Sequence, residues 1–197
     1  MQQGTTARAV HGAPTPTARA RLEVRWLLPD EAPAFADVYA RRSGLRTSPG
    51  EALGDVRGFF RDGVMVAGYR LGRTATRYAA LVGAEAAARW PFDPAEAAEI
   101  SHLWMDPLLD PDARRAVYSA MLTDLLGTGR RTIVGGTVDP VTRQSQMASL
   151  PWLLEEKVLE GVLAAPTTAW FYYGTPATMV ANAMRMGVPV PWLGLLR

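Results

Sequence analysis

Three polar side chains in one short stretch could carry acid–base chemistry. The stretch AEISHLWMDP, residues 98–107, has the composition of a buried strand, yet it contains Glu99, Ser101 and His102. Burying an unpaired charge costs several kcal/mol, which approaches the whole stability of a small domain. Either this strand is exposed or its polar side chains serve a purpose, and carboxylates and imidazoles are common proton-transfer groups in enzymes.

The spacing of Glu99 and His102 raises a geometric question. They are three residues apart, so in a regular strand they point to opposite faces of the sheet. A β-bulge at about Ser101–Leu103 would bring both to one face, and bulges are common beside active sites. Glu99 could then hold an ammonium group or accept its proton, and His102, with a reference pKa of about 6.5, would be a base matched to neutral pH.

A structural interpretation of the same residues stays open. Glu99 would pair with Arg70, and His102 would be a core or edge histidine with satisfied hydrogen bonds. Arg70 would be either part of the same constellation as Glu99 or only its counter-ion.

The composition excludes several kinds of site. The 197 residues contain no cysteine, which excludes disulfides, thiolate catalysis and zinc–thiolate sites, and only two histidines, so no metal site is expected. The net charge of +2 is too small to argue for nucleic acid. No apolar run approaches the roughly 20 residues of a membrane span, and no secretory signal is visible. We therefore expect a cytoplasmic protein; its oligomeric state is left open.

The chain length and composition predict one domain with a tail. Residues 1–20 contain Gly, Thr, Pro, Ala and Arg and no acidic residue, so they are expected to be a disordered tail. Apolar residues make up 48% of the chain, which is enough for a core, and residues 21–197 are expected to form a single domain.

The order of expected elements indicates an α/β (α+β) fold with a mixed, twisted sheet and helices on both faces. Strands are predicted at 21–28, 64–72, 76–83, 98–105, 130–138 and 167–174, with a hairpin turn centred on Gly72; helices are predicted at 29–44, 84–90, 110–127 and 175–187. The segment 45–63 is turn-rich and left unassigned, and 139–166 is expected to hold a helix and then a weaker helix or strand. The strands at 98–105 and 130–138 should be parallel, because a helix connects them.

This order resembles the GNAT acyltransferase fold, and three motifs resemble one branch of it, the acyl-homoserine-lactone synthases (LuxI-like) and the long-chain N-acyl amino acid synthases. VAGYRL (66–71) is similar to the V-x-G-x-x-R-L strand of that branch and places Arg70 on its arginine. EISHLWMDP (99–107) is similar to E-[LV]-S-R-[FL]-x-[VI] and matches its glutamate and serine, with His102 where the family has arginine. RMGVPVPWLG (185–194) is similar to the late G-[WLF]-P-V-x-x-L-G.

The resemblance implies N-acyl transfer from a phosphopantetheine thioester, either acyl-CoA or an acyl carrier protein, without a metal. It implies that the pantetheine arm lies in a splay between the strands at 98–105 and 130–138, with a backbone N–H near Leu103, Trp104 or Met105 facing the thioester. Glu99, Ser101, His102 and Arg70 are then the candidate catalytic residues.

The phosphate group of the donor has a less obvious place. Acetyl-CoA enzymes of this fold hold the pyrophosphate with a Gly-rich turn at the start of the helix that follows this strand, but here the turn reads DPLLDPDARR. It has no glycine, and its aspartates repel an anion. Arg114 and Arg115 are the candidate phosphate ligands, although a solvated basic pair is the simpler interpretation. The turn favours an acyl-carrier-protein donor, and it equally fits a domain that has lost catalysis.

Two further surfaces follow from the resemblance. An acidic acyl carrier protein would need a basic docking face, for which Arg114, Arg115, Arg130 and Arg131 are candidates. An acyl tunnel would be lined by apolar residues of the C-terminal third, for which plain core packing is the alternative; the candidates are Trp152, Trp170, Phe171, Met179, Met184 and Met186.

Three functions remain open from the sequence. The first is an N-acyltransferase that moves a medium or long acyl chain to a small amino-acid-like amine, and it predicts a deep apolar tunnel behind the splayed strands. The second is a conventional CoA-dependent N-acetyltransferase. The third is a non-catalytic binding module whose slot is filled by side chains.

Overall fold

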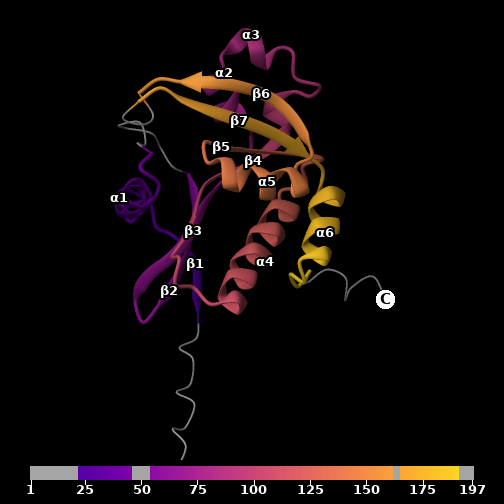
Figure 1. Cartoon of the computed structure of the whole chain (residues 1–197). Helices are drawn as coiled ribbons and strands as arrows, with labels where there is room; N and C mark the ends of the chain where they lie inside the picture. Colours follow the sequence, from indigo (N-terminus) through magenta and orange to yellow (C-terminus); the bar gives the residue numbers. More distant parts are fainter. Residues whose placement is uncertain (1–21, 46–53, 162–164, 191–197) are drawn as a thin grey trace, which may run out of the picture.

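The described part of the chain, residues 22–45, 54–161 and 165–190 of a computed structural model, forms one seven-stranded sheet with helices packed on it (Figure 1). The predicted tail and the residues 191–194 of the third motif lie outside these residues. The strands are β1 (Glu23–Trp26), β2 (Asp55–Arg61), β3 (Val64–Gly72), β4 (Ala97–Met105), β5 (Thr132–Thr137), β6 (Trp152–Leu159) and β7 (Thr167–Gly174). The helices are α1 (Ala32–Ser43), α2 (Thr76–Val82), α3 (Ala84–Ala87), α4 (Pro111–Gly127), α5 (Pro140–Ser149) and α6 (Pro176–Arg185), with a 3-10 turn at Pro94–Glu96.

The sheet is mixed, as predicted. Its strand order is β1-β2-β3-β4-β5-β7-β6, and only β4 and β5 are parallel. The helix between these two strands, α4, begins with Asp110 as its N-cap and Pro111 in its first turn, and its apolar stripe is buried against the sheet. The strand–helix–strand unit at 98–138 is thus confirmed.

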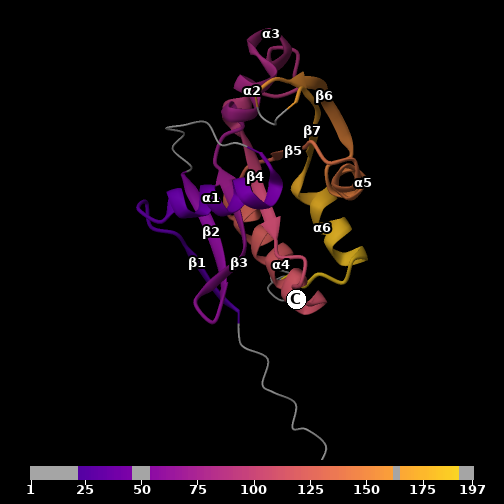
Figure 2. The ribbon, with the colours of Figure 1, turned by 60° about the vertical axis from the view of Figure 1, so that its left-hand side comes forward.

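Helices cover both faces of the sheet (Figure 2). On one face, which we call the α1 side, α1 packs over β4 near Trp104, and α2 and α3 pack over Ala97, Val134 and Phe171. On the other face, the α4 side, α4 and α6 pack over the main core, which includes Tyr69 and Ile100. None of the described helices is long and apolar enough to span a bilayer.

Two predictions at the first half of the sheet are wrong. Residues 76–83 form helix α2 instead of a strand, and the hairpin partner of β3 is β2, which the sequence left unassigned. The hairpin turns at Asp62 and Gly63, whose φ angles of 53° and 77° both lie in the left-handed region. A two-residue turn of this kind matches the twist of the flanking strands.

Candidate active site

The parallel pair β4–β5 separates partway along its length. Its hydrogen-bonded register runs from Ala97 opposite Thr132 to Ile100 opposite Gly135, although β4 continues to Met105 and β5 to Thr137. At the last pair the carbonyl of Ile100 accepts a hydrogen bond from the buried Tyr78 hydroxyl at 2.9 Å. A side chain of α2 therefore provides a partner for the backbone at the point where the two strands diverge, and the expected splay is present.

The expected β-bulge in β4 is also present. Arg70 of β3 lies opposite Ser101, whereas Gly68 lies opposite Trp104, so His102 and Leu103 together face one residue of β3. His102 has a φ of 53°, in the left-handed region that a histidine seldom adopts. The bulge changes the direction in which the side chains of β4 point, immediately beside the splay.

A chain of polar contacts links the four candidate catalytic residues. The completely buried Glu99 pairs through Oε1 with the Arg70 guanidinium. The Ser101 hydroxyl donates to the same Oε1 at 3.4 Å, and the ring Nδ1 of His102 lies 3.2 Å from the Ser101 oxygen. The ion pair between Glu99 and Arg70 is thus present, as the structural interpretation of these residues expected, and it is part of a larger network.

Gly72 makes room for the Glu99 side chain. The two residues are opposite one another in the β3–β4 register, and a Cβ atom on Gly72 would overlap Glu99 Cγ. The second carboxylate oxygen, Oε2, is buried and makes no hydrogen bond of standard geometry within the described residues, although the backbone N–H of Tyr78 favours the charged carboxylate. Glu99 therefore depends on a residue without a side chain for its position.

Burial and two arginines act in opposite directions on Glu99. Burial raises the pKa of its carboxyl, while the positive charges of Arg70 and Arg77 partly offset that rise. The net pKa is above the ordinary value of a glutamate, so this carboxylate is a stronger base than an exposed one.

His102 differs from the expected base. Its ring packs edge-on against Tyr39 of α1, with 4.7 Å between the centroids, and only 6% of the residue is exposed. Burial, and next the charges of Arg77 and Arg70, lower the pKa of His102 to about 3. The ring is therefore neutral at pH 7, and the charged imidazolium form is unfavourable. This corrects the expectation that His102 is a base matched to neutral pH.

Leu103, Trp104 and Met105 form the part of β4 beyond the bulge. The Trp104 side chain is buried with Phe35 under α1, while Leu103 and Met105 pack against the core on the α4 side. Their side chains therefore fix the strand, and any contact with a donor would come from their backbone groups.

The start of α4 is occupied by its own carboxylates. Asp106 accepts from the backbone N–H of Leu108, and Asp110 accepts from that of Ala113. Arg114 donates to the carbonyls of Leu109 and Pro107. An anion at this helix start would have to displace these contacts.

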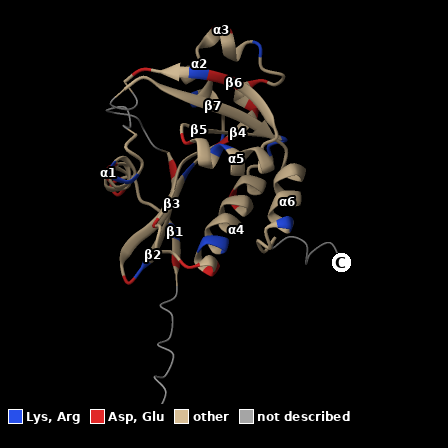
Figure 3. Ribbon diagram, in the orientation of Figure 1, with Lys and Arg blue, Asp and Glu red and all other residues tan. Residues whose placement is uncertain are grey.

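The candidate arginines of a basic docking face lie near the two ends of α4, and two of them pair with carboxylates. Arg115 pairs with Asp112, and Arg130 pairs with Glu96. From Arg115 to the end of α4 at Gly127 the helix rises by about 18 Å, and Arg130 follows beyond that end. Figure 3 shows basic and acidic segments scattered over the ribbon, with both signs at the start of α4.

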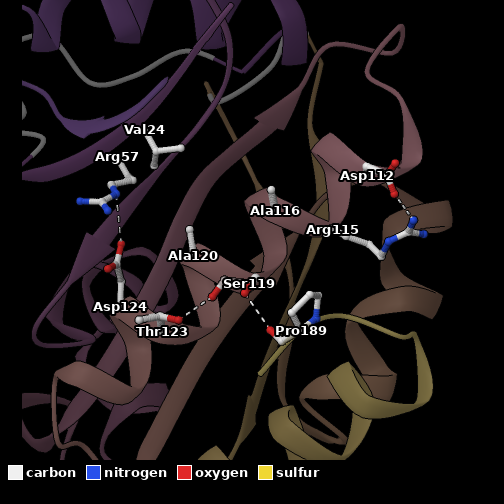
Figure 4. Close-up of a pocket in the computed structure, with 10 residues that line it drawn as sticks. All are labelled: Val24, Arg57, Asp112, Arg115, Ala116, Ser119, Ala120, Thr123, Asp124 and Pro189. Atoms are coloured by element: carbon white, nitrogen blue, oxygen red, sulfur yellow. Dashed lines mark hydrogen bonds and ion pairs between the residues drawn. The ribbon is translucent and has the colours of Figure 1, made fainter. Parts of the chain in front are cut away.

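The candidate tunnel residues do not converge either. Phe171 is buried on the α1 side and Met179 on the α4 side, whereas Trp152, Met184 and Met186 are exposed. Two open hollows lie elsewhere. One, of about 600 Å³, is open and lies between β1, β2, α4 and Pro189 (Figure 4); the other is formed by α2, α3 and residues 93–95. The deep tunnel expected behind the splayed strands is not among them.

Three residues of the site were missed from the sequence. Tyr39 and Tyr78 contact the network from α1 and α2, and Arg77 acts on the charges of both Glu99 and His102. No local pattern marks them, because they reach β4 only through packing of the α1 side. Within the described residues, no three histidine, aspartate or glutamate side chains cluster as metal ligands would.

Solved structures share this architecture. FeeM, an N-acyl amino acid synthase from uncultured soil microbes, matches with a TM-score of 0.59 and 19% identity over 78% of this chain and 91% of its own. BjaI, a CoA-dependent acyl-homoserine lactone synthase, matches with a TM-score of 0.53 and 17% identity over 79% of this chain and 80% of its own. An N-acetyltransferase from Staphylococcus aureus Mu50 matches with a TM-score of 0.53 and 12% identity over 80% of this chain and 99% of its own.

The chain has the GNAT fold. No protein-family model matches it, and no curated protein matches it in sequence. Because the identities to the solved structures are below 25%, the likeness establishes the fold, and the activity has to be argued from the site.

Proposed function

We propose that this protein is an N-acyltransferase that moves an acyl chain from a phosphopantetheine thioester to the amine of a small amino-acid-like acceptor. The observation that carries the proposal is the Glu99–Ser101–His102 chain at the point where β4 leaves β5. If the Arg70–Glu99 ion pair served only to stabilise the fold, it would not need the Ser101 hydroxyl and the His102 ring that continue the chain of contacts toward the splay.

The reaction needs one bond made and one broken. The amine nitrogen attacks the thioester carbonyl carbon, and the carbon–sulfur bond then breaks to leave an amide and a thiol. One amine proton must leave the nitrogen, and the sulfur finally takes a proton. The residues must therefore provide a proton acceptor, donors for the tetrahedral oxyanion and a slot for the pantetheine arm.

The network offers a route for the amine proton. His102 is neutral, so a proton taken at Nε2 can be matched by release of the Nδ1 proton to Ser101, whose own proton passes to Glu99. The ring remains neutral throughout, which agrees with a pKa far below 7. Burial makes Glu99 the better final acceptor, because its pKa is raised.

The splay supplies the remaining parts. Backbone amides of Leu103–Met105 that point away from β3 have no strand partner on the β5 side, so they can donate to the oxyanion or to the arm. Two arginines lie beside a single network carboxylate, Glu99, which already pairs with Arg70; this excess of positive charge favours an acceptor that carries a carboxylate as well as its amine.

The donor that fits best is a carrier-protein thioester. The start of α4 uses its amides for Asp106 and Asp110, which leaves no nest for a pyrophosphate. A carrier protein supplies its own docking surface, so the enzyme has less need for such a nest. A second candidate is an acetyl-CoA-dependent N-acetyltransferase, which is favoured because the candidate tunnel residues Trp152, Met184 and Met186 are exposed.

Mass spectrometry of bacterial extracts tests the proposal. The protein and a Glu99→Gln variant are expressed in parallel, and the organic and aqueous extracts are compared. We expect N-acyl amino acids with the wild type that are absent with the variant, and the mass of the acyl group separates a long-chain from an acetyl donor. A folded wild-type protein that produces no new amide would contradict the proposal.

A further inference from the structure

Arg143 on α5 differs from most of the described arginines. Arginines of β1, β2, β3 and α4, for example, form ion pairs with carboxylates. The guanidinium of Arg143 instead lies over the Trp170 ring, 4.6 Å from its centroid, and its Nε donates to the Tyr172 hydroxyl at 2.9 Å. Within the described residues it has no carboxylate partner, although it is partly buried.

These contacts fix the orientation of the Arg143 side chain. The ring stack and the Nε bond hold the guanidinium plane, and the two terminal nitrogens are left to act as a fork. Such a fork matches the oxygens of a phosphate group. A partly buried cation without an anionic partner is unfavourable, so the arrangement favours an anionic ligand.

The next turn of α5 faces the splay. Gln146 donates through Nε2 to the carbonyl of Gly136 at 3.3 Å, and Gly136 is the first residue of β5 beyond its last pair with β4. The Gln146 Oε1 is buried and has no hydrogen-bond partner within the described residues. A buried acceptor without a partner beside the splay calls for a donor, and an amide N–H would satisfy it.

A phosphopantetheine arm contains amide groups and ends in a phosphate. Gln146 and Arg143 are three residues apart on one helix, and so lie one above the other on the same helix face. We propose that Arg143 binds the phosphate of the donor arm and that Gln146 accepts a hydrogen bond from one of its amides. This proposal rests on the proposed function, and it names a phosphate site on α5 in place of the start of α4.

The proposed direction of the arm agrees with the layers of the fold. α5 contacts β5 and β7 and packs with α6 on the α4 side, whereas Glu99 and Ser101 point to the α1 side, as Ala97 does. A donor whose phosphate is on α5 would pass its thioester through the splay toward the network. The acceptor would approach from the opposite face.

Isothermal titration calorimetry on the full-length protein tests this site with two probes. Pantetheine and 4′-phosphopantetheine differ only in the phosphate, so the ratio of their dissociation constants reports its contribution. We expect wild type to prefer the phosphorylated probe roughly tenfold, which is the scale of a charge-assisted hydrogen bond. Arg143→Gln should bring the ratio close to one with little change in pantetheine affinity, and Arg143→Lys should retain part of it.

Arg185→Gln is the matched control. Arg185 is an exposed arginine of α6 that touches the carbonyl of Ala148, so its loss changes the net charge equally, and the ratio should stay at the wild-type value. Circular dichroism melting confirms that each variant folds. Arg114→Gln tests the competing site at the start of α4.

The outcomes separate this proposal from the proposed function. If Arg143→Gln keeps the tenfold preference, if Arg114→Gln abolishes it, or if wild type binds both probes equally, the Arg143 site is overturned while thioester binding can stand. If wild type binds neither probe, both proposals fail.

Discussion

The ring Nδ1 of His102 lies 3.2 Å from the hydroxyl oxygen of Ser101, which in turn donates to the buried carboxylate of Glu99. One hydroxyl thus connects an imidazole at a β-bulge to a carboxylate inside the sheet. The connection exists because the bulge places His102 on the same side of β4 as Ser101. Without the bulge, the ring would point to the α4 side.

Ser101→Ala removes this connection and leaves both ends in place. We expect the rate of acyl transfer to fall roughly 10- to 100-fold, because proton transfer by positioned groups contributes factors of that size. The free energy of unfolding should change by only about 1 kcal/mol. Steady-state kinetics and denaturant unfolding measure the two effects.

Ser119→Ala is the matched control for Ser101→Ala. The Ser119 hydroxyl donates to the Pro189 carbonyl at 2.7 Å, far from the network. Its loss should cost similar stability and leave the rate unchanged. Equal rates for the Ser101 and Ser119 variants would show that the hydroxyl chain carries no proton.

Gly72→Ala tests the dependence of Glu99 on space. The added methyl would overlap the Glu99 side chain, so we expect a loss of about 1–3 kcal/mol in the free energy of unfolding together with a loss of activity. Gly127→Ala at the end of α4 is the control, since a Cβ there meets nothing within 4 Å. It should be neutral or slightly stabilising, and a Gly72 variant as stable as this control would contradict the packing.

His102 should make the protein acid-sensitive. Its folded-state pKa of about 3 lies below the unfolded value of about 6.5, so the unfolded chain binds more protons between these two values. The free energy of unfolding therefore falls as the pH drops from 6.5 toward 3, by up to about 5 kcal/mol. Glu99 acts in the opposite sense above pH 4.5, because its pKa is raised.

His102→Asn isolates the histidine contribution, because asparagine tolerates the left-handed backbone at this position and does not titrate. Denaturant unfolding at pH 7 and pH 5 measures the difference. Wild type should lose more stability over this interval than the variant. An equal loss in the two proteins would mean that the ring is already protonated or exposed in the folded state.

The sequence predicts the second half of the fold well because its local signals agree. Asp110 and Pro111 mark the start of α4, and the apolar stripe of that helix fits the sheet. The β-bulge in β4 follows from the spacing of Glu99 and His102 in an otherwise apolar strand. These features depend on residues close to one another in the chain.

In the first half of the chain, the prediction fails at β2 and α2, whose structures depend on tertiary packing. β2 contains Gly58, which looks like a turn residue but is required there because the Leu27 and Phe60 side chains fill the space of its Cβ. α2 has β-prone residues, yet it forms a helix that buries Tyr78 and Val82 against the sheet. The Asp62–Gly63 dipeptide is a hairpin signal that would have located β2.

The chemistry of the site could be predicted only in part. Glu99, Ser101 and Arg70 come together as the motifs indicate, but the pKa of His102 depends on burial under Tyr39, which comes from a helix about 60 residues earlier in the chain. Arg143 and Gln146 lie in the helix expected at the start of 139–166, but no local pattern marks their contacts with Trp170, Tyr172 and Gly136. Long-range packing sets the properties of His102, Arg143 and Gln146.

The central claim is that Glu99 is the final proton acceptor in acyl transfer to an amine. The most direct test is thiol release from an acyl-phosphopantetheine thioester in the presence of amino acids other than cysteine. The protein has no cysteine, so a thiol-reactive chromogen reports only the released donor thiol. We predict amine-dependent release by wild type that falls at least about 100-fold in Glu99→Gln at unchanged pantetheine affinity. Equal rates in the two proteins, or no amine-dependent release by folded wild type with acetyl, octanoyl or dodecanoyl donors, would contradict the account.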